Sequence, residues 1–461
     1  MPLPHQLLQA VATPGGGRIA LVLGAGCSIE QPTGLPSGAT AARELHRLLT
    51  ADGVLAAGDV HDPSDLSALA DAVFAKTGSQ RDLVQRFLDA YNLKRANAND
   101  GYLLVAAMLA EQVLASVVTL NFDLALVDAL VNLGIGTDVA VIEKPADLPH
   151  QKLINIYYLH GSANAEDPDE WVLRTAALQH EWANTWQPIV AIRVLAAPVV
   201  VFAGLGTPVA VLIESTKLLK SAIPNATVYQ VDVVPKADSR FAQELAITDG
   251  AYIQSGWRDF MQDLATRLMI EHRQQLANAA NQKVQDDGLA PEDLTTSLDR
   301  LHELGLVTSG RIRAQWLLTS SAYCRATPDH HRLVADLLLA VATVARLSGT
   351  QAVIVEDSVI EFHRDNRVLA ACLLSSGRGH RGRPSIEALI EQQRRRYRAR
   401  AVSISGAIVG GTSEWGAVST PPADVVRGDV ANDIVLGHAP LPLHHIAELR
   451  ANPHTIQQVV R

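Results

Sequence analysis

Short apolar runs alternate with helical segments over the first 280 residues of the chain. The runs are rich in β-branched residues and too short to be helices, so they indicate buried strands. They cover residues 18–23, 116–120, 139–142, 155–159, 199–203 and 227–234, and the predicted helices cover 39–50, 65–76, 81–91, 102–114, 124–133, 176–193 and 210–223. Parallel strands are usually joined by crossover helices. The alternation therefore predicts an α/β fold with a Rossmann-like, doubly wound, mostly parallel sheet.

This pattern ends near residue 280, after a helix predicted over 257–280 and a polar stretch over 281–293. We place an α/β domain at 1–280 and an α+β C-terminal domain at 294–461. The tail, with five prolines from Pro421 to Pro453, is predicted to be irregular. In the second domain we expect helices at 294–304 and 334–347 and strands at 352–355, 358–362, 368–374 and 402–409.

Composition excludes several classes of protein. With 48% hydrophobic and 19% charged residues, the 461-residue chain is expected to be globular. Its net charge of −9 gives no general electrostatic reason to bind nucleic acid. The three cysteines, Cys27, Cys324 and Cys372, are too far apart for a disulfide framework or a four-cysteine zinc site. We therefore expect a reducing, cytoplasmic location and no metal.

No segment resembles a signal or a membrane span. The first thirteen residues contain no Lys or Arg, which argues against a secretory signal. The most apolar stretch, 189–206, contains Arg193 and Pro198, which argues against a transmembrane helix. The expectation is a protein without membrane attachment.

One arginine-rich stretch stands out in the acidic chain, and two interpretations of it remain open. A surface for nucleic acid or nucleotides is one, because arginine suits phosphate recognition. A solvated or oligomer-facing helix, with Glu387 and Glu391 as partial counter-charges, is favoured over it. The stretch comprises Arg378, Arg381, Arg383, Arg394, Arg395, Arg396, Arg398 and Arg400.

The first predicted strand leads directly into Gly24-Ala25-Gly26. Glycines let the backbone approach a phosphate, and the N–H groups at a helix start favour an anion. A tight turn of the same composition is equally consistent with this short motif. The dehydrogenase fingerprint GxGxxG is not met, because Ile29 replaces its third glycine, and a hydride-transfer enzyme is disfavoured.

Three ordered motifs carry a more specific resemblance. Gly24-Ala25-Gly26-Cys27-Ser28, followed by Gly34-Leu35-Pro36, resembles the sirtuin signature. Thr119-Leu120-Asn121-Phe122-Asp123 resembles the T-x-N-x-D motif of that family, and Leu159-His160-Gly161 its catalytic segment. Residues 201–206 and Val231-Asp232 are fainter matches. The resemblance spans roughly 19–260 and implies NAD as substrate, bound at the carboxyl ends of parallel strands.

The resemblance also implies a role for each matching residue. Asn121 would position a water molecule and the ribose, and His160 would accept a proton. Asp123 and Ser28 would line the nicotinamide pocket, with Asp123 holding the carboxamide. The remaining NAD-binding candidates are Gly24, Ala25 and Gly26 at the pyrophosphate, Thr119, Gly204, and Asp232 at the adenosine ribose.

Departures from the family pattern reduce the number of activities that the resemblance implies. Protein deacylases of this family carry a four-cysteine zinc module after the histidine, and no cysteine lies between His160 and Gly204. The arginine that commonly follows the signature is also absent, because Ser37-Gly38-Ala39 occupies its place. In these departures the chain resembles the sirtuin-like NAD+ hydrolases of bacterial antiphage defence, and we expect it to bind no zinc. This resemblance implies that 1–280 is the catalytic domain and that 294–461 has a sensing, regulatory or oligomerisation role.

The sequence therefore predicts NAD+ hydrolysis to nicotinamide and ADP-ribose, controlled by the C-terminal domain or by a partner. A homo-oligomer or a companion defence protein is expected. Two alternatives stay open: an NAD-dependent deacylase or ADP-ribosyltransferase, and a sensor that binds NAD or ADP-ribose without turnover.

Overall fold

The structure, a computed structural model, divides the chain into two compact units, Met1–Leu268 and Met269–Arg461. It describes residues 3–13, 15–179, 185–223, 227–284, 289–290, 292–319, 321–376, 404–410, 442–445 and scattered positions from 449 to 460. The unit boundary falls within one long helix, α11 (Trp257–Val284). The arginine-rich stretch from Arg378 to Arg400 lies outside the described residues.

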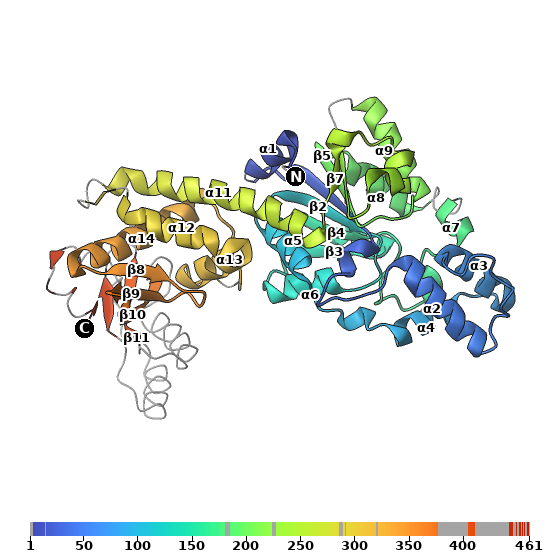
Figure 1. Ribbon diagram of the computed structural model, residues 1–461, viewed down its shortest axis with the longest axis horizontal. Helices are drawn as coiled ribbons and strands as arrows, with labels where there is room; N and C mark the ends of the chain where they lie inside the picture. Colours follow the sequence, from blue (N-terminus) through green and yellow to red (C-terminus); the bar gives the residue numbers. More distant parts are fainter. Residues whose placement is uncertain are drawn as a thin grey trace. The chain divides into compact units, whose positions relative to one another are not determined.

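The first unit is built on a seven-stranded sheet in which every neighbouring pair of strands is parallel (Figure 1). The strand order is β3-β4-β2-β1-β5-β6-β7. β2, β3 and β4 lie on one side of β1, and β5, β6 and β7, which come later in the chain, lie on its other side. This confirms the predicted doubly wound parallel sheet. The bounds are β1 Ile19–Leu23, β2 Leu114–Thr119, β3 Val139–Ile142, β4 Ile154–Tyr158, β5 Val199–Ala203, β6 Thr227–Asp232 and β7 Tyr252–Gln254.

Helices cover this sheet and explain why its strands are so apolar. β1, β4 and β5 are buried along their whole length, as expected for strands covered on both faces. Alternate strand residues share one core with α8 (Trp186–Leu195), α9 (Ala210–Ala222) and α10 (Arg240–Glu244). α5 (Asp100–Ala110) is almost entirely buried and packs against β2. α1 (His5–Ala12) contacts β5, and α6 (Ala125–Asn132) packs against α5.

A small helical cluster has a separate core. It contains α2 (Gly38–Ala51), α3 (Leu66–Thr77) and α4 (Arg81–Ala90). Their apolar faces pack together with Ala163, Trp171 and Leu173, which belong to the segment that follows His160. The segment after His160 is thus anchored by apolar packing.

In its described residues the second unit combines the helices α12, α13 and α14 with a five-stranded sheet of order β12-β11-β10-β9-β8. β8, β9 and β10 pair antiparallel, whereas β10, β11 and β12 pair parallel. This confirms the α+β organisation predicted for the C-terminal region. The bounds are α12 Glu292–Glu303, α13 Gly305–Trp316, α14 Pro328–Ser348, β8 Gln351–Ile354, β9 Ile360–Arg364, β10 Arg367–Ser376, β11 Ile404–Gly410 and β12 Leu443–His445.

Several predicted boundaries were wrong. The helix expected over 102–114 ends at Ala110, because a turn with Gln112 at a positive φ of 56° leads into β2. The helix expected over 176–193 is two helices, α7 (Thr175–Gln179) and α8. β7 and α13 were not predicted: β7 has only three residues, and Gly305 and Gly310 weaken the helical pattern of α13. The tail expected to be irregular contains β12.

No helix in the described part of the chain combines the length and the apolar character that crossing a membrane requires.

Candidate functional site

The predicted site residues lie at one edge of the parallel sheet. Gly24 directly follows β1, and Asn121 and His160 each come two residues after the end of β2 and β4. Gly204 directly follows β5, and Asp232 is the last residue of β6. Because all these strands are parallel, their carboxyl ends meet at the same edge. The strand order reverses between β1 and β5, which is where ligands of such sheets usually bind.

The glycines after β1 and β5 pack directly against each other. The N–H of Gly24 donates to Ala203 O at 2.9 Å, and that of Gly26 donates to Gly204 O at 3.0 Å. A Cβ at Gly26 would lie 2.6 Å from the Cα of Gly204. Close approach of two backbones therefore accounts for both glycines. Directly after Gly24 the chain forms a short 3₁₀ helix, Ala25–Ser28.

Asn121 is buried and held in one orientation. Its Nδ2 donates to Gly24 O at 3.0 Å, and it lies 3.1 Å from Ser28 Oγ and 3.0 Å from the hydroxyl of Tyr102. A backbone carbonyl can only accept, so the amide nitrogen must face Gly24 and Oδ1 must face the other way. No described residue donates to Oδ1. The Oδ1 of Asn121 is thus an acceptor that no described residue uses.

Asp123 is tied to the first glycine loop through Ser28. Its Oδ2 accepts from Ser28 Oγ at 2.8 Å, and its Oδ1 accepts from the N–H of Ala125 at 3.0 Å. Burial raises the pKa of Asp123, and these two hydrogen bonds oppose the rise. The structure brings Gly24, Ser28, Asn121 and Asp123 into one hydrogen-bonded group.

Thr119 supports this group from β2. Its Oγ1 accepts the backbone N–H of Asn121 at 3.1 Å, and its side chain is buried. The hydroxyl therefore shapes the turn that presents Asn121.

His160 approaches the same edge from β4. Its ring lies beside Phe122, with 6.2 Å between ring centroids, and Phe122 stacks on Trp171 at 4.1 Å. Desolvation lowers the pKa of His160 to about 4, although a hydrogen bond with the Leu120 backbone opposes the shift. The imidazole is therefore neutral at physiological pH and able to accept a proton.

Asp232 lies at the end of β6, apart from the hydrogen-bonded group around Asn121. Its Oδ1 accepts from the N–H of Val233 at 2.7 Å and of Val234 at 3.4 Å. Partial burial raises its pKa. Ala25 opens the 3₁₀ helix and is partly exposed.

Sequence reasoning missed Tyr102, whose hydroxyl lies between Ser28 and Asn121. Tyr102 falls inside a continuous apolar run, so no periodicity or motif marks it. Asn99, which caps α5 and donates to Cys27 O at 2.8 Å, was also missed. For Asn99 a signal existed: an Asn-Asp pair before an apolar run is typical of a helix start.

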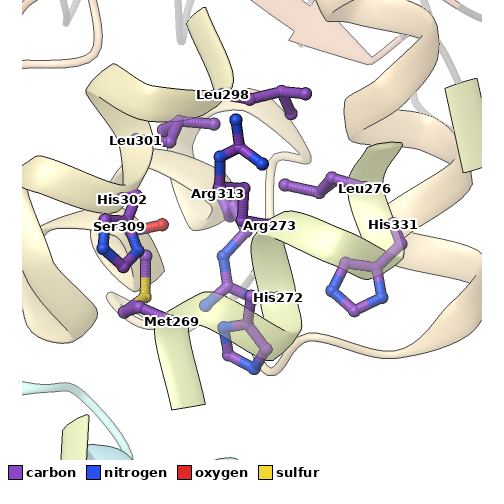
Figure 2. Close-up of a pocket in the computed structure, with 10 residues that line it drawn as sticks. All are labelled: Met269, His272, Arg273, Leu276, Leu298, Leu301, His302, Ser309, Arg313 and His331. Carbon is purple, nitrogen blue, oxygen red and sulfur yellow. The ribbon is translucent and has the colours of Figure 1, made fainter. Parts of the chain in front are cut away.

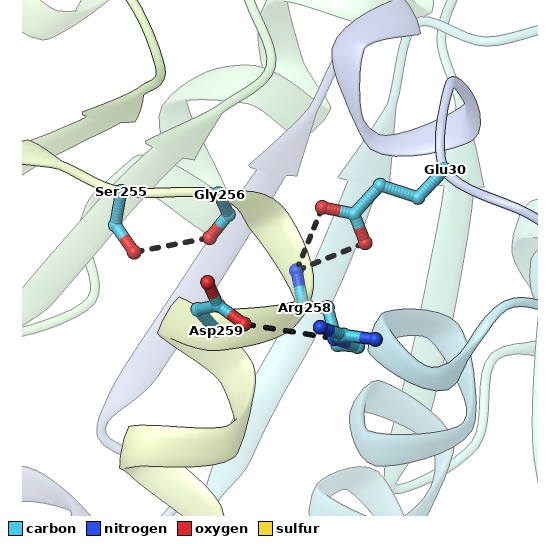
Figure 3. Close-up of polar contacts among 5 residues, drawn as sticks. All are labelled: Glu30, Ser255, Gly256, Arg258 and Asp259. Atoms are coloured by element: carbon cyan, nitrogen blue, oxygen red, sulfur yellow. Dashed lines mark hydrogen bonds and ion pairs between the residues drawn. The ribbon is translucent and has the colours of Figure 1, made fainter.

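Glu30 was also missed, and it connects the loop after Ser28 to α11. Its two carboxylate oxygens each lie 3.2 Å from the backbone N–H of Arg258 (Figure 3). The first N–H groups of a helix lack partners within the helix and favour negative charge. Figure 3 also shows the guanidinium of Arg258 directed to Asp259, at 3.5 Å.

A small cavity, lined in part by two arginines and three histidines, lies wholly within the second unit (Figure 2). Arg273, one of its lining residues, pairs with Asp299 at 2.7 Å, and the rings of His272 and His331 lie 5.7 Å apart. None of the predicted site residues lines it. Its lining comprises Met269, His272, Arg273, Leu276, Leu298, Leu301, His302, Ser309, Arg313 and His331.

Within the described residues, no group of three or more His, Cys, Asp or Glu side chains is arranged to hold a metal ion. The three cysteines are buried and free of disulfide bonds. Burial raises the pKa of the Cys27 thiol well above its ordinary value, which fits a small packed residue.

A family model described as SIR2-like domain matches residues 115–243, which begin within β2 and end within α10. It contains Asn121, Asp123 and His160. A search of curated proteins found no significant match.

Three solved structures illustrate the likeness to Sir2 proteins. A mutant Sir2 homologue in complex with ADP-ribose is 15% identical, covering 58% of this chain and 96% of its own, with a TM-score of 0.37. A Sir2 homologue–NAD complex is 16% identical, with coverage of 58% and 94% and a TM-score of 0.37. Sir2 with a p53 peptide and NAD+ is 13% identical, with coverage of 58% and 97% and a TM-score of 0.33. These scores are low, so the fold rests on the strand pairing described above.

Proposed function

We propose that the N-terminal unit hydrolyses NAD+ to nicotinamide and ADP-ribose. One observation carries the proposal: hydrogen bonds from Nδ2 hold Asn121 at the sheet edge that also carries a neutral His160, and they leave Oδ1 without a donor among the described residues. The SIR2-like match over residues 115–243 supports NAD as the substrate, as does the resemblance of the glycine loop to the sirtuin signature.

The reaction requires little more than these two side chains. A water molecule attacks the anomeric carbon of the nicotinamide ribose, a carbon–oxygen bond forms, and the carbon–nitrogen bond to nicotinamide breaks. The electron pair of that bond returns to the nicotinamide ring nitrogen, whose positive charge is neutralised. His160 accepts the proton that the attacking water loses. Asn121 Oδ1 would orient the water or a ribose hydroxyl by accepting a hydrogen bond.

Hydrolysis is favoured over transfer to a peptide by the segment after His160. In this chain Trp171 stacks on Phe122, its indole N–H donates to Ser162 O at 2.9 Å, and Gln80 donates to its carbonyl at 2.6 Å. Aromatic packing thus organises the segment in which peptide deacylases of the sirtuin family carry their zinc module. A water acceptor needs no peptide groove.

The test is nicotinamide and ADP-ribose release from NAD+ by the purified full-length protein. We expect His160→Ala and Asn121→Ala to lower turnover by about 100-fold or more, as losses of proton transfer and of positioning commonly do. His150→Ala, a change at an exposed histidine of the same unit, serves as the control and should leave the rate unchanged.

Other outcomes would contradict the proposal. A requirement for an acetylated peptide, with O-acetyl-ADP-ribose as product, would identify a deacylase. ADP-ribose attached to protein would identify a transferase. Saturable NAD+ or ADP-ribose binding without turnover, under all activating conditions tried, would identify a sensor.

The biological role included in the proposal is NAD+ depletion during antiphage defence, triggered through the C-terminal unit, assembly or a companion protein. Bacteria expressing the wild-type chain should lose NAD+ after phage infection and form fewer plaques. Bacteria expressing His160→Ala should keep their NAD+ and lose protection. Equal protection by both chains would exclude an enzymatic role in defence.

A further inference from the structure

Tyr102 occupies a central position that neither motif nor family match assigns. It lies in the first turn of α5 and is 1% exposed. Its hydroxyl is 2.7 Å from Ser28 Oγ and 3.0 Å from Asn121 Nδ2. One hydroxyl therefore joins the loop after β1 to the residue that the proposed reaction needs after β2.

The direction of each hydrogen bond follows from the donors present. Ser28 has a single hydroxyl proton, which it donates to Asp123 Oδ2 at 2.8 Å when that carboxyl is ionised. The proton between Tyr102 and Ser28 must then come from Tyr102. The oxygen of Tyr102 is left to accept from Asn121 Nδ2. The chain of donors runs from Asn121 through Tyr102 and Ser28 to Asp123.

We infer that Tyr102 is the positioning residue that keeps the Asn121 amide in its working orientation. The inference rests on the proposed function, because it assigns Tyr102 a part in NAD+ cleavage. Asn121 Nδ2 carries two protons, and Gly24 O takes one of them. The other points to Tyr102 and Ser28, so both donors of the amide are held and Oδ1 stays turned to the substrate.

The position of Tyr102 is itself fixed by its neighbours. Asn99 Oδ1 accepts the backbone N–H of Tyr102 at 3.0 Å, while Asn99 Nδ2 donates to Cys27 O at 2.8 Å. The ring of Tyr102 meets the indole of Trp257 edge-on, with 6.2 Å between centroids. Gly101 leaves room for this contact, because a Cβ there would lie 2.1 Å from Trp257 Nε1. The hydroxyl therefore has little freedom to follow Asn121 if Asn121 turns.

The test substitution is Tyr102→Phe, which removes the hydroxyl and keeps the ring packed on Trp257. Without that hydroxyl, the second Nδ2 proton keeps only Ser28 Oγ as an acceptor, and Ser28 loses one of its two donors. We expect kcat for nicotinamide release to fall about 10-fold or more while KM for NAD+ stays within about 3-fold. In crystal structures of wild type and variant, the Asn121 amide should be turned, or divided between two orientations, only in the variant.

The matched control is Tyr157→Phe. Tyr157 is a buried tyrosine of β4 whose side chain lines a cavity with Arg193 and Val194. Neighbouring strand residues point to opposite faces, so Tyr157 points away from Tyr158, whose hydroxyl reaches Asp123 O at 3.1 Å. The control should match wild type in kcat and in the Asn121 orientation.

An unmoved Asn121 in Tyr102→Phe, with wild-type kcat, would overturn the inference. A lower melting temperature, with kcat and the orientation of the Asn121 amide unchanged, would also overturn the inference. That result would show that Tyr102 has a merely structural role. If the wild-type protein releases no nicotinamide, the proposed function fails by itself. The orientation of Asn121 in the two crystal structures then decides the role of Tyr102 alone.

Discussion

His160 is the titratable residue of the site that the proposed reaction uses as a base. An ordinary histidine titrates near pH 6.5, whereas desolvation lowers the pKa of His160 to about 4. The imidazole is therefore neutral, and competent as a base, at every pH above about 4. Its low basicity suits a role in which it receives the proton late, as the bond to nicotinamide breaks.

The pH profile of the wild-type protein tests this view of His160. A catalytic histidine of ordinary pKa would make kcat/KM decline as the pH falls, with a midpoint near pH 6.5. We expect no such decline in kcat/KM between pH 8 and pH 5. The decline should come near pH 4. A midpoint near 6.5 that vanishes in His160→Ala would contradict the expectation.

The same pKa makes folding stability depend on pH. The unfolded chain takes up a proton on His160 below about pH 6.5, whereas the folded chain does so only near pH 4. Stability is therefore lost as pH falls from 6.5 to 4. Urea unfolding of wild type and His160→Asn at pH 7 and pH 5 should show a smaller loss in the variant, and equal losses would argue against the shift.

At the level of elements, the loops after β1 and β5 act as one interlocked unit. Gly24 donates a backbone hydrogen bond to Ala203, the last residue of β5, and Gly26 donates one to Gly204, which adopts a positive φ of 66°. Backbone atoms occupy the space that a side chain at Gly26 would need. The glycine motif that predicts a phosphate loop thus also has a packing role at the point where the strand order reverses.

Gly26→Ala tests the interlock. The new Cβ would lie 2.6 Å from Gly204 Cα, and backbone on both sides must shift. We expect a loss of about 1–3 kcal/mol, which lowers the melting temperature of the unit by several degrees. Gly206→Ala in the same loop is the control, because no atom lies within 4 Å of its Cβ and it should melt within about 1 °C of wild type. Equal melting temperatures for the two variants would show that the loops separate easily.

For the whole molecule, the parallel sheet could be predicted from the sequence, whereas contacts between residues far apart along the chain could not. Each buried strand leaves a local pattern, so the six longer strands of the first unit could be located, and the motifs could be placed at their carboxyl ends. Tyr102 reaches Ser28 across 74 residues, and Glu30 reaches Arg258 across 228. Such contacts depend on how helices dock, which no local pattern encodes.

In the second unit, too, a contact between distant residues could not be predicted from the sequence. Its core joins α12, α13 and α14 to the five-stranded sheet, with Trp316 fully buried at its centre. The indole of Trp316 donates to Ser358 O at 2.9 Å, a contact that links α13 to the turn between β8 and β9. Since α13 itself was not predicted, neither was this link. A sensing or assembly role for this unit therefore remains a prediction of the sequence resemblance.

Metal dependence is the property of the whole chain that best separates the proposed hydrolase from a zinc-containing deacylase. Each cysteine is packed in its own setting: Cys27 Sγ donates to Ala203 O at 3.5 Å, Cys324 lies beside Arg325, and Cys372 lies in β10 beside Ser405. We expect dialysis against a zinc chelator to leave melting temperature and nicotinamide release unchanged, with zinc by mass spectrometry well below one per chain. Stoichiometric zinc, whose removal lowers the melting temperature by several degrees, would contradict this expectation, because structural zinc contributes directly to folding energy.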